Sequence, residues 1–395
     1  MRRERGFTLV EMLVAVTIMM IVVGGVFAVF NPSQGAFQAQ PEVADMQQRI
    51  RVAVTEMSDQ LLMAGAGTYR TDASGPLTNV LAPIAPYRIG STSSDDRSGT
   101  FFRTDTISVM YVPVQAAEAA LAIPVAGVTG DLTIATSTGC PPGVSACGFR
   151  VGNRALVFDG SGGFDTFTVT GVQNGAMAAT SNLQHGLDTL SRVYPAGARV
   201  AEVAMHTFYL KNDPATDTFQ LMHYDGDRVD EALVDNVVGL RFDYFGDPAP
   251  PAILRDPSEA VGPWTSYGPK PPMTGTDSSN DSWPAGENCA FTIAGGRQVS
   301  RLATLGAGSL VPLTQAQLTD GPWCPDATSR NRFDADLLRV RKIRVTLRVQ
   351  TGEKALRPPT GTLVNRPGAG RDGSRLVPDQ QIKFDVTPRN VNLNR

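Results

Sequence analysis

The longest apolar segment of this 395-residue chain lies near its start, from Phe7 to Phe30, and Glu11 is the one charged residue in it. A helix of this length, rising about 1.5 Å per residue, can cross the roughly 30 Å hydrocarbon core of a bilayer. Three arginines precede the segment, and positive residues beside a span tend to remain in the cytoplasm. The pattern predicts one membrane-spanning helix over residues 7–30, with a cytoplasmic N-terminus and an exported remainder.

Beyond Pro41 the apolar positions recur every three or four residues, which is the spacing of one buried helix face. Gly65 and Gly67 are expected to end this helix, because glycine commonly follows a last helical turn. We therefore predict one long helix over residues 7–64. Its buried stripe consists of Val43, Met46, Ile50, Ala53, Val54, Met57 and Leu61.

Two places are expected to interrupt or kink this helix, namely Gly24–Gly25 and Asn31–Pro32. Proline removes a helix hydrogen bond and disfavours the helical conformation of the residue before it. A segment that melts within an assembly and a simple kink at the membrane surface are both compatible with this pattern.

After Gly67 the apolar period changes to two, which is typical of half-buried strands. A hairpin is expected around residues 209–224, and one short helical turn near Glu231–Asp235. The expected strands are Thr106–Val114, Leu132–Thr136, Ala155–Phe158, Asp165–Val172, Ala198–Lys211, Thr218–Tyr224, Gly239–Phe245, Val340–Gln350 and Gln381–Val386.

The composition favours a large, turn-rich head behind the helix. Glycine and proline number 39 and 28, which indicates many turns, and the net charge of −3 gives no broad nucleic-acid footprint. We expect an α+β fold in which the long N-terminal helix packs on a large, mostly antiparallel sheet with long loops. The expected parts are a β-rich head at 65–245, a loop-rich insertion at 246–335 and the C-terminal strands of the head at 336–395.

The four cysteines are Cys140, Cys147, Cys289 and Cys324. An even number of cysteines in an exported domain predicts disulfides, and the sequence leaves three pairings open. Zinc is the competing interpretation, but no Cys-x-x-Cys pair or nearby histidine supports it. We expect structural disulfides and no metal.

The sequence Gly6-Phe7-Thr8-Leu9-Val10-Glu11 closely resembles the processing site of type IV prepilins and type II secretion pseudopilins. The resemblance implies that a prepilin peptidase cuts between Gly6 and Phe7, methylates the new N-terminus and leaves residues 1–6 as a leader. Glu11 is then the fifth mature residue. Its carboxylate can neutralise the amine of Phe7, either its own or that of a neighbouring subunit.

Further segments resemble the minor pilin PilW family and its relative, the J-type minor pseudopilin of type II secretion. These segments are Arg51–Ala66 at the helix end, which contains Leu62-Met-Ala-Gly65, then Leu233–Asp247 as a turn followed by a strand, and Arg341–Val349 with Gln381–Asn390 as the last two strands. The stretch from Pro248 to Asp334 resembles nothing that we can place.

No catalytic motif is apparent: the chain has no Gly-x-Ser-x-Gly elbow, phosphate loop or dinucleotide fingerprint. His206 and His223 fall on neighbouring predicted strands, where they are interpreted as sheet residues rather than a metal or catalytic pair. Gly160–Gly163 is interpreted as a hairpin turn. We expect a protein that is not an enzyme and that needs no cofactor.

Two clusters of charge offer alternatives for ligand binding. Asp225, Asp227, Asp230 and Glu231 provide oxygen atoms for calcium, although Asp-Gly is also a strong turn signal. Basic residues follow one predicted strand, which is either a solvated outer face or a DNA-binding stripe. These residues are Arg339, Arg341, Lys342, Arg344 and Arg348.

The resemblance as a whole implies a minor type IV pilin, inserted in the inner membrane and then carried to the pilus and cell surface. Its partners are the prepilin peptidase and the major and other minor pilins, and a position at or near the tip is expected because the head is bulky. The alternatives are a pseudopilin of type II secretion and a tip adhesin. In the adhesin, residues 246–334 contact a surface ligand through Trp264, Tyr267, Trp283 and Trp323.

Overall fold

The computed structural model describes residues 7–68, 75–89, 102–136, 140, 144–159, 163–213, 218–226, 229–250, 283–325, 329, 331–358 and 376–392. The chain divides into two compact units. The first comprises Met1–Arg51 and Arg348–Gln381, and the second comprises Val52–Leu347 and Ile382–Arg395.

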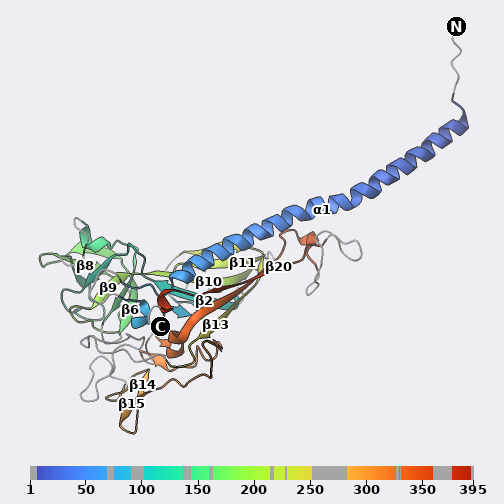
Figure 1. Cartoon of the computed structure of the whole chain (residues 1–395). Coiled ribbons are helices and arrows are strands. Elements are labelled where there is room, and N and C mark those ends of the chain that lie inside the picture. The colour runs from blue at the N-terminus through green and yellow to red at the C-terminus, as the bar shows by residue number, and fades with distance from the viewer. Residues whose placement is uncertain are drawn as a thin grey trace. The chain divides into compact units, whose positions relative to one another are not determined.

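Helix α1 spans Leu9–Met63 and is continuous, so the expected interruptions at Gly24–Gly25 and Asn31–Pro32 are wrong (Figure 1). A proline within a helix removes only one backbone hydrogen bond, and the turns on either side retain theirs. The predicted stripe is confirmed by the burial of its members. Met46, Ala53, Met57 and Leu61 are fully buried, and Val43, Ile50 and Val54 are partly buried.

The last turns of α1 are fastened to the head within the second unit. Tyr111 donates a hydrogen bond from its hydroxyl to Gln60 Oε1 over 2.7 Å, and Asn390 Nδ2 donates to the carbonyl of Met63 over 3.3 Å. Gly65 follows with a φ of 82°, and its N–H bonds the carbonyl of Met110 over 3.0 Å. The expected stop at Gly65 is confirmed, because glycine adopts this left-handed conformation without strain.

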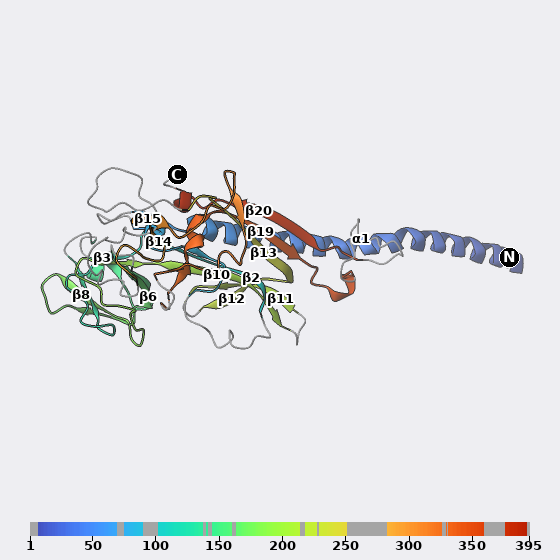
Figure 2. The ribbon, with the colours of Figure 1, turned by 90° about the horizontal axis from the view of Figure 1, so that it is seen from below.

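Two antiparallel sheets form the main part of the head (Figure 2). A five-stranded sheet has the order β1 (Ile84–Ala85), β2 (Phe102–Tyr111), β10 (Ala204–Asp213), β11 (Thr218–Tyr224), β12 (Asp230–Asp235). A four-stranded sheet has the order β16 (Val311–Leu313), β13 (Val237–Gly246), β19 (Val340–Val349), β20 (Gln380–Val386). Strand β13 lies against β2, β10 and β11, which brings the two sheets together.

Two smaller sheets carry a core of their own, which includes Leu132, Val157, Phe167 and Leu183, each fully buried. One has the order β3 (Glu118–Ala120), β9 (Arg199–Glu202), β5 (Arg154–Phe158), β6 (Phe164–Thr168). The other has the order β4 (Leu132–Ala135), β8 (Thr180–Gln184), β7 (Gly171–Asn174).

The remaining described elements are short. A ladder of four residue pairs joins β14 (Phe291–Ala294) to β15 (Arg297–Ser300), and one of two pairs joins β17 (Trp323–Cys324) to β18 (Phe333–Asp334). The 3₁₀ helices are η1 (Leu77–Asn79), η3 (Ser145–Gly148), η4 (Ala335–Arg339), η5 (Lys354–Leu356) and η6 (Asn390–Asn392).

Most predicted strands are present, and the differences have local causes. The expected single strand over 198–211 is two strands, β9 and β10, which belong to different sheets. The expected strand over 165–172 is likewise divided between β6 and β7. The helical turn expected near Glu231–Asp235 is wrong: these residues form β12, because β11 offers them an open antiparallel edge.

Both disulfides lie within the second unit. Cys140 is bonded to Cys147, and Cys289 is bonded to Cys324. The first closes a short loop with a sequence separation of 7, and the second closes a separation of 35. The second bond joins the segment before β14 to β17, so that it fastens part of the region expected to be a loop-rich insertion.

Candidate functional site

The segment expected to be processed and assembled lies at the start of α1. Phe7 is 88% exposed, whereas the preceding Gly6 lies outside the described residues. Thr8 is the residue immediately before the first helical residue, Leu9, and therefore occupies the N-cap position.

Glu11 and Thr8 form a reciprocal capping box at this position. The backbone N–H and the hydroxyl of Thr8 donate to Glu11 Oε2 over 2.9 and 2.8 Å, and Glu11 N–H donates to Thr8 Oγ1 over 3.3 Å. These bonds satisfy backbone N–H groups that a helix start leaves without partners. The carboxylate expected to meet an N-terminal amine is therefore held one helical turn from Phe7.

The side chains of Leu9–Phe27 form an apolar surface that no part of the described chain covers. This segment has a mean hydropathy of 2.5, and none of it is buried. Thr17, a hydroxyl residue within it, donates to the carbonyl of Leu13 over 2.8 Å, which satisfies its polar group without water. Within the described residues, this is the one helix long and apolar enough to cross a membrane.

A second contact of α1 lies in the first unit, at Glu42. Its Oε2 accepts hydrogen bonds from the hydroxyl of Thr351, from Gly352 N–H over 3.0 Å and from Glu353 N–H over 3.3 Å. The bond from Thr351 is the main cause that lowers the pKa of Glu42 from its usual value. The carboxylate thus ties α1 to the segment that follows β19.

Arg339 contradicts the expectation of a basic outer stripe, because its side chain is fully buried. Its Nε lies 2.6 Å from Asp336 Oδ1, and its Nη1 and Nη2 donate to the carbonyls of Pro248 and Ala303 over 2.8 and 2.6 Å. A buried guanidinium needs such partners, since an unpaired charge in the interior is costly. Arg339 therefore joins the region after β13 to the end of η4.

The other members of the expected stripe face carboxylates. Lys342 and Arg344 lie 2.5 and 2.7 Å from the carboxylate of Asp385 and lower its pKa, with Arg344 as the larger cause. Arg341 pairs with Asp247 over 2.7 Å and Arg348 with Asp379 over 2.7 Å. These ion pairs reduce the positive charge that a DNA backbone requires, so the solvated-face interpretation fits better.

The two histidines expected on neighbouring strands are in direct contact. His206 Nδ1 lies 2.7 Å from His223 Nε2, and their rings stack with centroids 5.0 Å apart. Tyr111 lies 3.2 Å from His206 Nε2 through its hydroxyl, which also reaches Gln60 of α1. Burial lowers the pKa of His206 to about 4, with a smaller contribution from His223. The pair is thus part of the packing between α1 and the sheet.

The acidic residues considered for calcium have partners within the protein. Asp230 accepts a 2.7 Å bond from the hydroxyl of Tyr209, and Glu231 lies 3.5 Å from His223 Nδ1. Asp225 accepts a bond from Val229 N–H over 3.0 Å, as in a turn, and Asp227 lies outside the described residues. These contacts support the turn interpretation.

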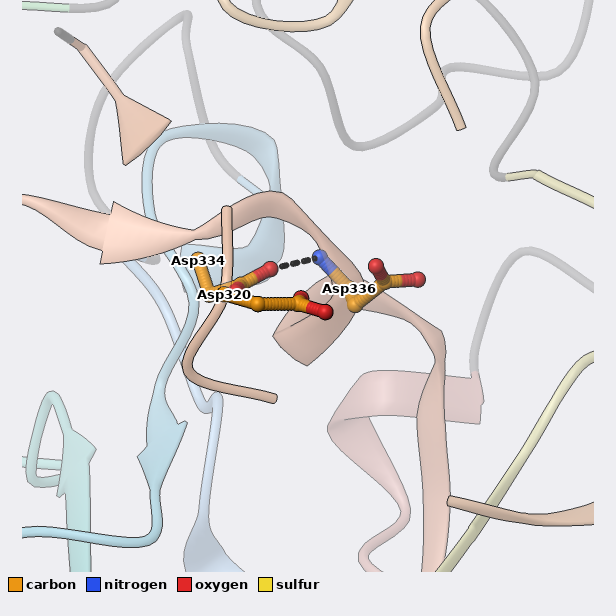
Figure 3. A group of neighbouring side chains, drawn as sticks. All are labelled: Asp320, Asp334 and Asp336. Atoms are coloured by element: carbon orange, nitrogen blue, oxygen red, sulfur yellow. Dashed lines mark hydrogen bonds between the residues drawn. The ribbon is translucent and has the colours of Figure 1, made fainter. Parts of the chain in front are cut away.

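A different acidic group comes together in three dimensions, namely Asp320, Asp334 and Asp336 (Figure 3). Asp334 accepts hydrogen bonds from the N–H of Asp336 over 2.8 Å and from that of Gly321 over 2.6 Å. Burial raises the pKa of Asp334 to about 6. Asp336 pairs with Arg339, so the two buried members, Asp334 and Asp336, have partners within the head, whereas Asp320 is exposed.

Two of the four aromatic residues proposed for a surface ligand are described, and both contact the protein. Trp283 Nε1 donates to the carbonyl of Pro325 over 3.3 Å, and the guanidinium of Arg301 lies over its ring. Arg332 lies over the ring of Trp323 at 4.6 Å. Trp264 and Tyr267 lie outside the described residues.

Sequence reasoning missed two residues of importance in these contacts, Thr8 and Glu42. Thr8 was detectable, because Thr-x-x-Glu before an apolar run is the signature of a capping box. Glu42 had no local signal, since its partners lie more than three hundred residues away.

Comparison with known proteins gives one match, at the start of the chain. Residues 1–27 match the family model for the prokaryotic N-terminal methylation motif. No curated protein and no solved structure matches the chain. The chain therefore carries a prepilin-type methylation motif that includes an exposed apolar helical segment, the combination expected of a membrane-anchored type IV pilin-like protein or pseudopilin.

Proposed function

We propose that this chain is a minor type IV pilin that enters a pilus after a prepilin peptidase removes residues 1–6. The observation that carries the proposal is the apolar surface of Leu9–Phe27, which lies within the matched residues 1–27 and which no part of the described chain covers. Such a surface needs either lipid or other apolar helices around it. Assembly moves this surface from the lipid of the membrane to the apolar helices of neighbouring subunits.

Glu11 sets the axial register of the subunit in the filament. A carboxylate within the apolar core costs about 2.5–3.5 kcal/mol on insertion scales, so a cationic partner stabilises the assembled state. The amine created at Phe7 by cleavage is such a partner, in the same subunit or in a neighbour. The capping box keeps the carboxylate at the helix start, where this amine arises.

The head, at residues 65–395, lies outside the filament in this proposal. Two main sheets, two smaller sheets and two disulfides make it large for a repeating subunit. A bulky head packs poorly when repeated along a filament, which favours a place at or near the tip. Prepilin peptidase and the major and other minor pilins are the partners.

The proposal is tested by mass analysis of the full chain, produced with and without a prepilin peptidase. We expect peptidase-dependent loss of residues 1–6 and one added methyl group at Phe7, and Gly6→Ala is expected to block both. Material that retains Met1 in the presence of active peptidase overturns the proposal.

Incorporation is tested separately by isolating filaments. Glu11→Ala is expected to be processed but absent from filaments, whereas Asp45→Ala, on a surface ion pair of the same helix, is expected to enter normally. Equal incorporation of Glu11→Ala contradicts the assigned role of the carboxylate.

A pseudopilin of type II secretion is the second candidate, because the methylation motif is common to both systems. Restoring piliation or protein secretion in strains that lack each system distinguishes them. Rescue of secretion alone assigns the chain to the secretion system.

A further inference from the structure

One edge of the four-stranded sheet is covered along only part of its length. Strand β16 pairs with Tyr244–Gly246 of β13, and the pairing ends there. In the part of the chain that the structure describes, no strand pairs with residues 237–243 of β13 on this side. A strand edge carries backbone N–H and C=O groups at every second residue, which can bond an added strand. This part of β13 is therefore a place where a further strand can pair.

The residues after β16 explain why this strand is short. Thr314 and Gln317 form a capping box, in which the N–H and the hydroxyl of Thr314 each donate to Gln317 Oε1 over 2.9 Å. Gln317 N–H donates to Thr314 Oγ1 over 3.3 Å, and Leu318 N–H bonds the carbonyl of Thr314 over 3.2 Å. A turn of this kind cannot continue an extended pairing, so the contact with β13 stops at Leu313.

A cavity of about 510 Å³ follows the open edge. The consecutive residues Arg241–Phe245 of β13 line it, and so do the consecutive residues Pro312–Gln315. Because successive side chains of a strand point to opposite faces, a space that touches consecutive residues lies along the backbone edge and not over one face. Pro86, after β1, and Thr106, in β2, form the remaining wall. The cavity is therefore a groove beside β13, on the line that a longer β16 would follow.

The shape of this groove fits an extended segment better than a second sheet edge. Pro86, Thr106 and Gln315 stand beside the strand, so the edge is recessed. In a second copy of the chain the same edge lies behind the same walls, and two recessed edges cannot meet. A single extended segment is narrow enough to enter, and β16 shows that this edge accepts one.

The two faces of β13 specify the side chains of the incoming segment. Phe242 and Tyr244 are buried, and Leu313 lies opposite Tyr244 on the same face. Arg241 and Asp243 belong to the other face and pair with each other over 2.8 Å, so their charges are matched within the chain. An incoming strand should therefore place apolar residues on the first face and uncharged polar residues on the second.

We propose that the open edge of β13 binds an extended segment of another protein by strand addition. The segment alternates apolar and uncharged polar residues. Hydrogen bonds between the two main chains supply the affinity, and the alternation of side chains supplies the specificity. The binding property belongs to the head and does not depend on the processing or assembly proposed above.

The test uses the full chain in a non-ionic detergent and a fluorescent peptide of alternating threonine and valine, with a lysine at each end for solubility. Fluorescence anisotropy measures the binding. Two further peptides carry N-methyl groups, one on every valine and the other on every threonine. The N–H groups of alternate residues point to the same edge of a strand, so only one methylated peptide loses its bonds to β13. That peptide is expected to bind at least tenfold more weakly, and the other about as tightly as the parent.

Amide hydrogen exchange locates the bound peptide. Binding should slow exchange within residues 237–243 of β13 and leave β12, the edge strand of the five-stranded sheet, unchanged. Gln315→Trp is expected to fill the groove and to weaken peptide binding about tenfold. Ala316→Trp is the matched control and is expected to change nothing, because Ala316 is also exposed but does not line the groove.

Absence of binding by the parent peptide overturns the proposal. Equal binding of the two methylated peptides also overturns it, since that result indicates contacts through side chains alone. Equal protection of β12, or equal binding by the two tryptophan variants, excludes this groove as the site. Self-association of the chain that the peptide reverses assigns the edge to a second copy and overturns the proposed partner. A failure of filament incorporation leaves these readouts unchanged, so the two proposals fail independently.

Discussion

Thr8 and Glu11 cap the start of α1 for each other, with Thr8 donating to the carboxylate and accepting from the Glu11 N–H. The helix start therefore already satisfies the carboxylate that assembly is proposed to use. The proposed cleavage after Gly6 leaves both residues in the mature chain. In the proposed assembly, the amine of Phe7 therefore competes with Thr8 for a carboxylate that is already hydrogen-bonded.

Replacing Thr8 by alanine is expected to lower the free energy of opening of the first turn of α1 by about 1 kcal/mol, the usual cost of losing an N-cap. Thr8→Ser keeps the hydroxyl and is the matched control. The measurement is amide hydrogen exchange at Glu11 in the detergent-solubilised chain, since its N–H bonds the lost hydroxyl. Equal exchange in the alanine and serine variants contradicts the capping role.

Replacing Glu42 by glutamine is expected to lower the free energy of local opening of the segment after β19 by about 1–3 kcal/mol. The reason is that charge-assisted hydrogen bonds from three donors are weakened. Faster amide exchange at Gly352 and Glu353 is the readout. Asp45→Asn is the control on the same helix and should have little effect, since its ion pair is a surface pair.

The same contact gives a pH dependence of known sign. The pKa of Glu42 is lowered in the folded chain, so its contribution is present above the ordinary value near 4.5 and is lost as the pH falls through the folded pKa. Protection at Gly352 should therefore fall on acidification in the wild type. Protection that rises on acidification contradicts this assignment.

Replacing Arg339 by methionine is expected to lower the free energy of unfolding by about 3–5 kcal/mol, because Asp336 and two carbonyls lose their partner in the interior. Arg241→Met is the control, since that side chain is 71% exposed and is expected to cost at most about 0.5 kcal/mol. Denaturant titration of both variants gives the comparison. Similar losses for the two are incompatible with a structural role for Arg339.

The histidine pair is expected to destabilise the head in acid. The pKa of His206 is about 4 in the folded chain and near 6.5 in the unfolded chain, so the unfolded state binds a proton first on acidification. The contribution of His206 to the free energy of unfolding is therefore full above pH 6.5 and is lost as the pH falls toward 4. The change amounts to at most about 3 kcal/mol.

Asp334 acts with the opposite sign, since its raised pKa of about 6 lowers stability as the pH rises from 3.8 to 6. The measurement is therefore the difference in unfolding free energy between the wild type and His206→Gln, followed from pH 7 to pH 4. This difference should shrink or reverse in acid. A difference that is independent of pH excludes the assigned titration.

The two disulfides are expected to contribute unequally to the free energy of unfolding. The loop-entropy model gives about 4 kcal/mol for the Cys289–Cys324 bond and about 2.5 kcal/mol for the Cys140–Cys147 bond, because the first closes the longer loop. Double alanine variants of each pair, compared by denaturant titration, test the order. Alkylation without reductant should find no free thiol in the exported protein.

Much of α1 and of the strands could be predicted because their signals are local. The stripe through Met46, Ala53, Met57 and Leu61 repeats at helical spacing, and β11 and β19 alternate at strand spacing. The local signal failed at Glu231–Asp235, where pairing with β11 decided the conformation. It also failed at Pro32, because the helix on both sides tolerates one missing bond.

The residues of the candidate site also fall into those with a local sequence signal and those whose contacts depend on the fold. Gly6, Phe7 and Glu11 lie within six consecutive residues, directly at the start of the apolar run. The sequence by itself therefore determined the apolar helix and the prepilin-type start. Only the tertiary structure decided that Arg339 is buried rather than part of a surface stripe, and that Glu42 meets Thr351. The reason is physical: periodicity reports which face of a segment is apolar, whereas the partner of a charge depends on which distant segments the fold brings beside it.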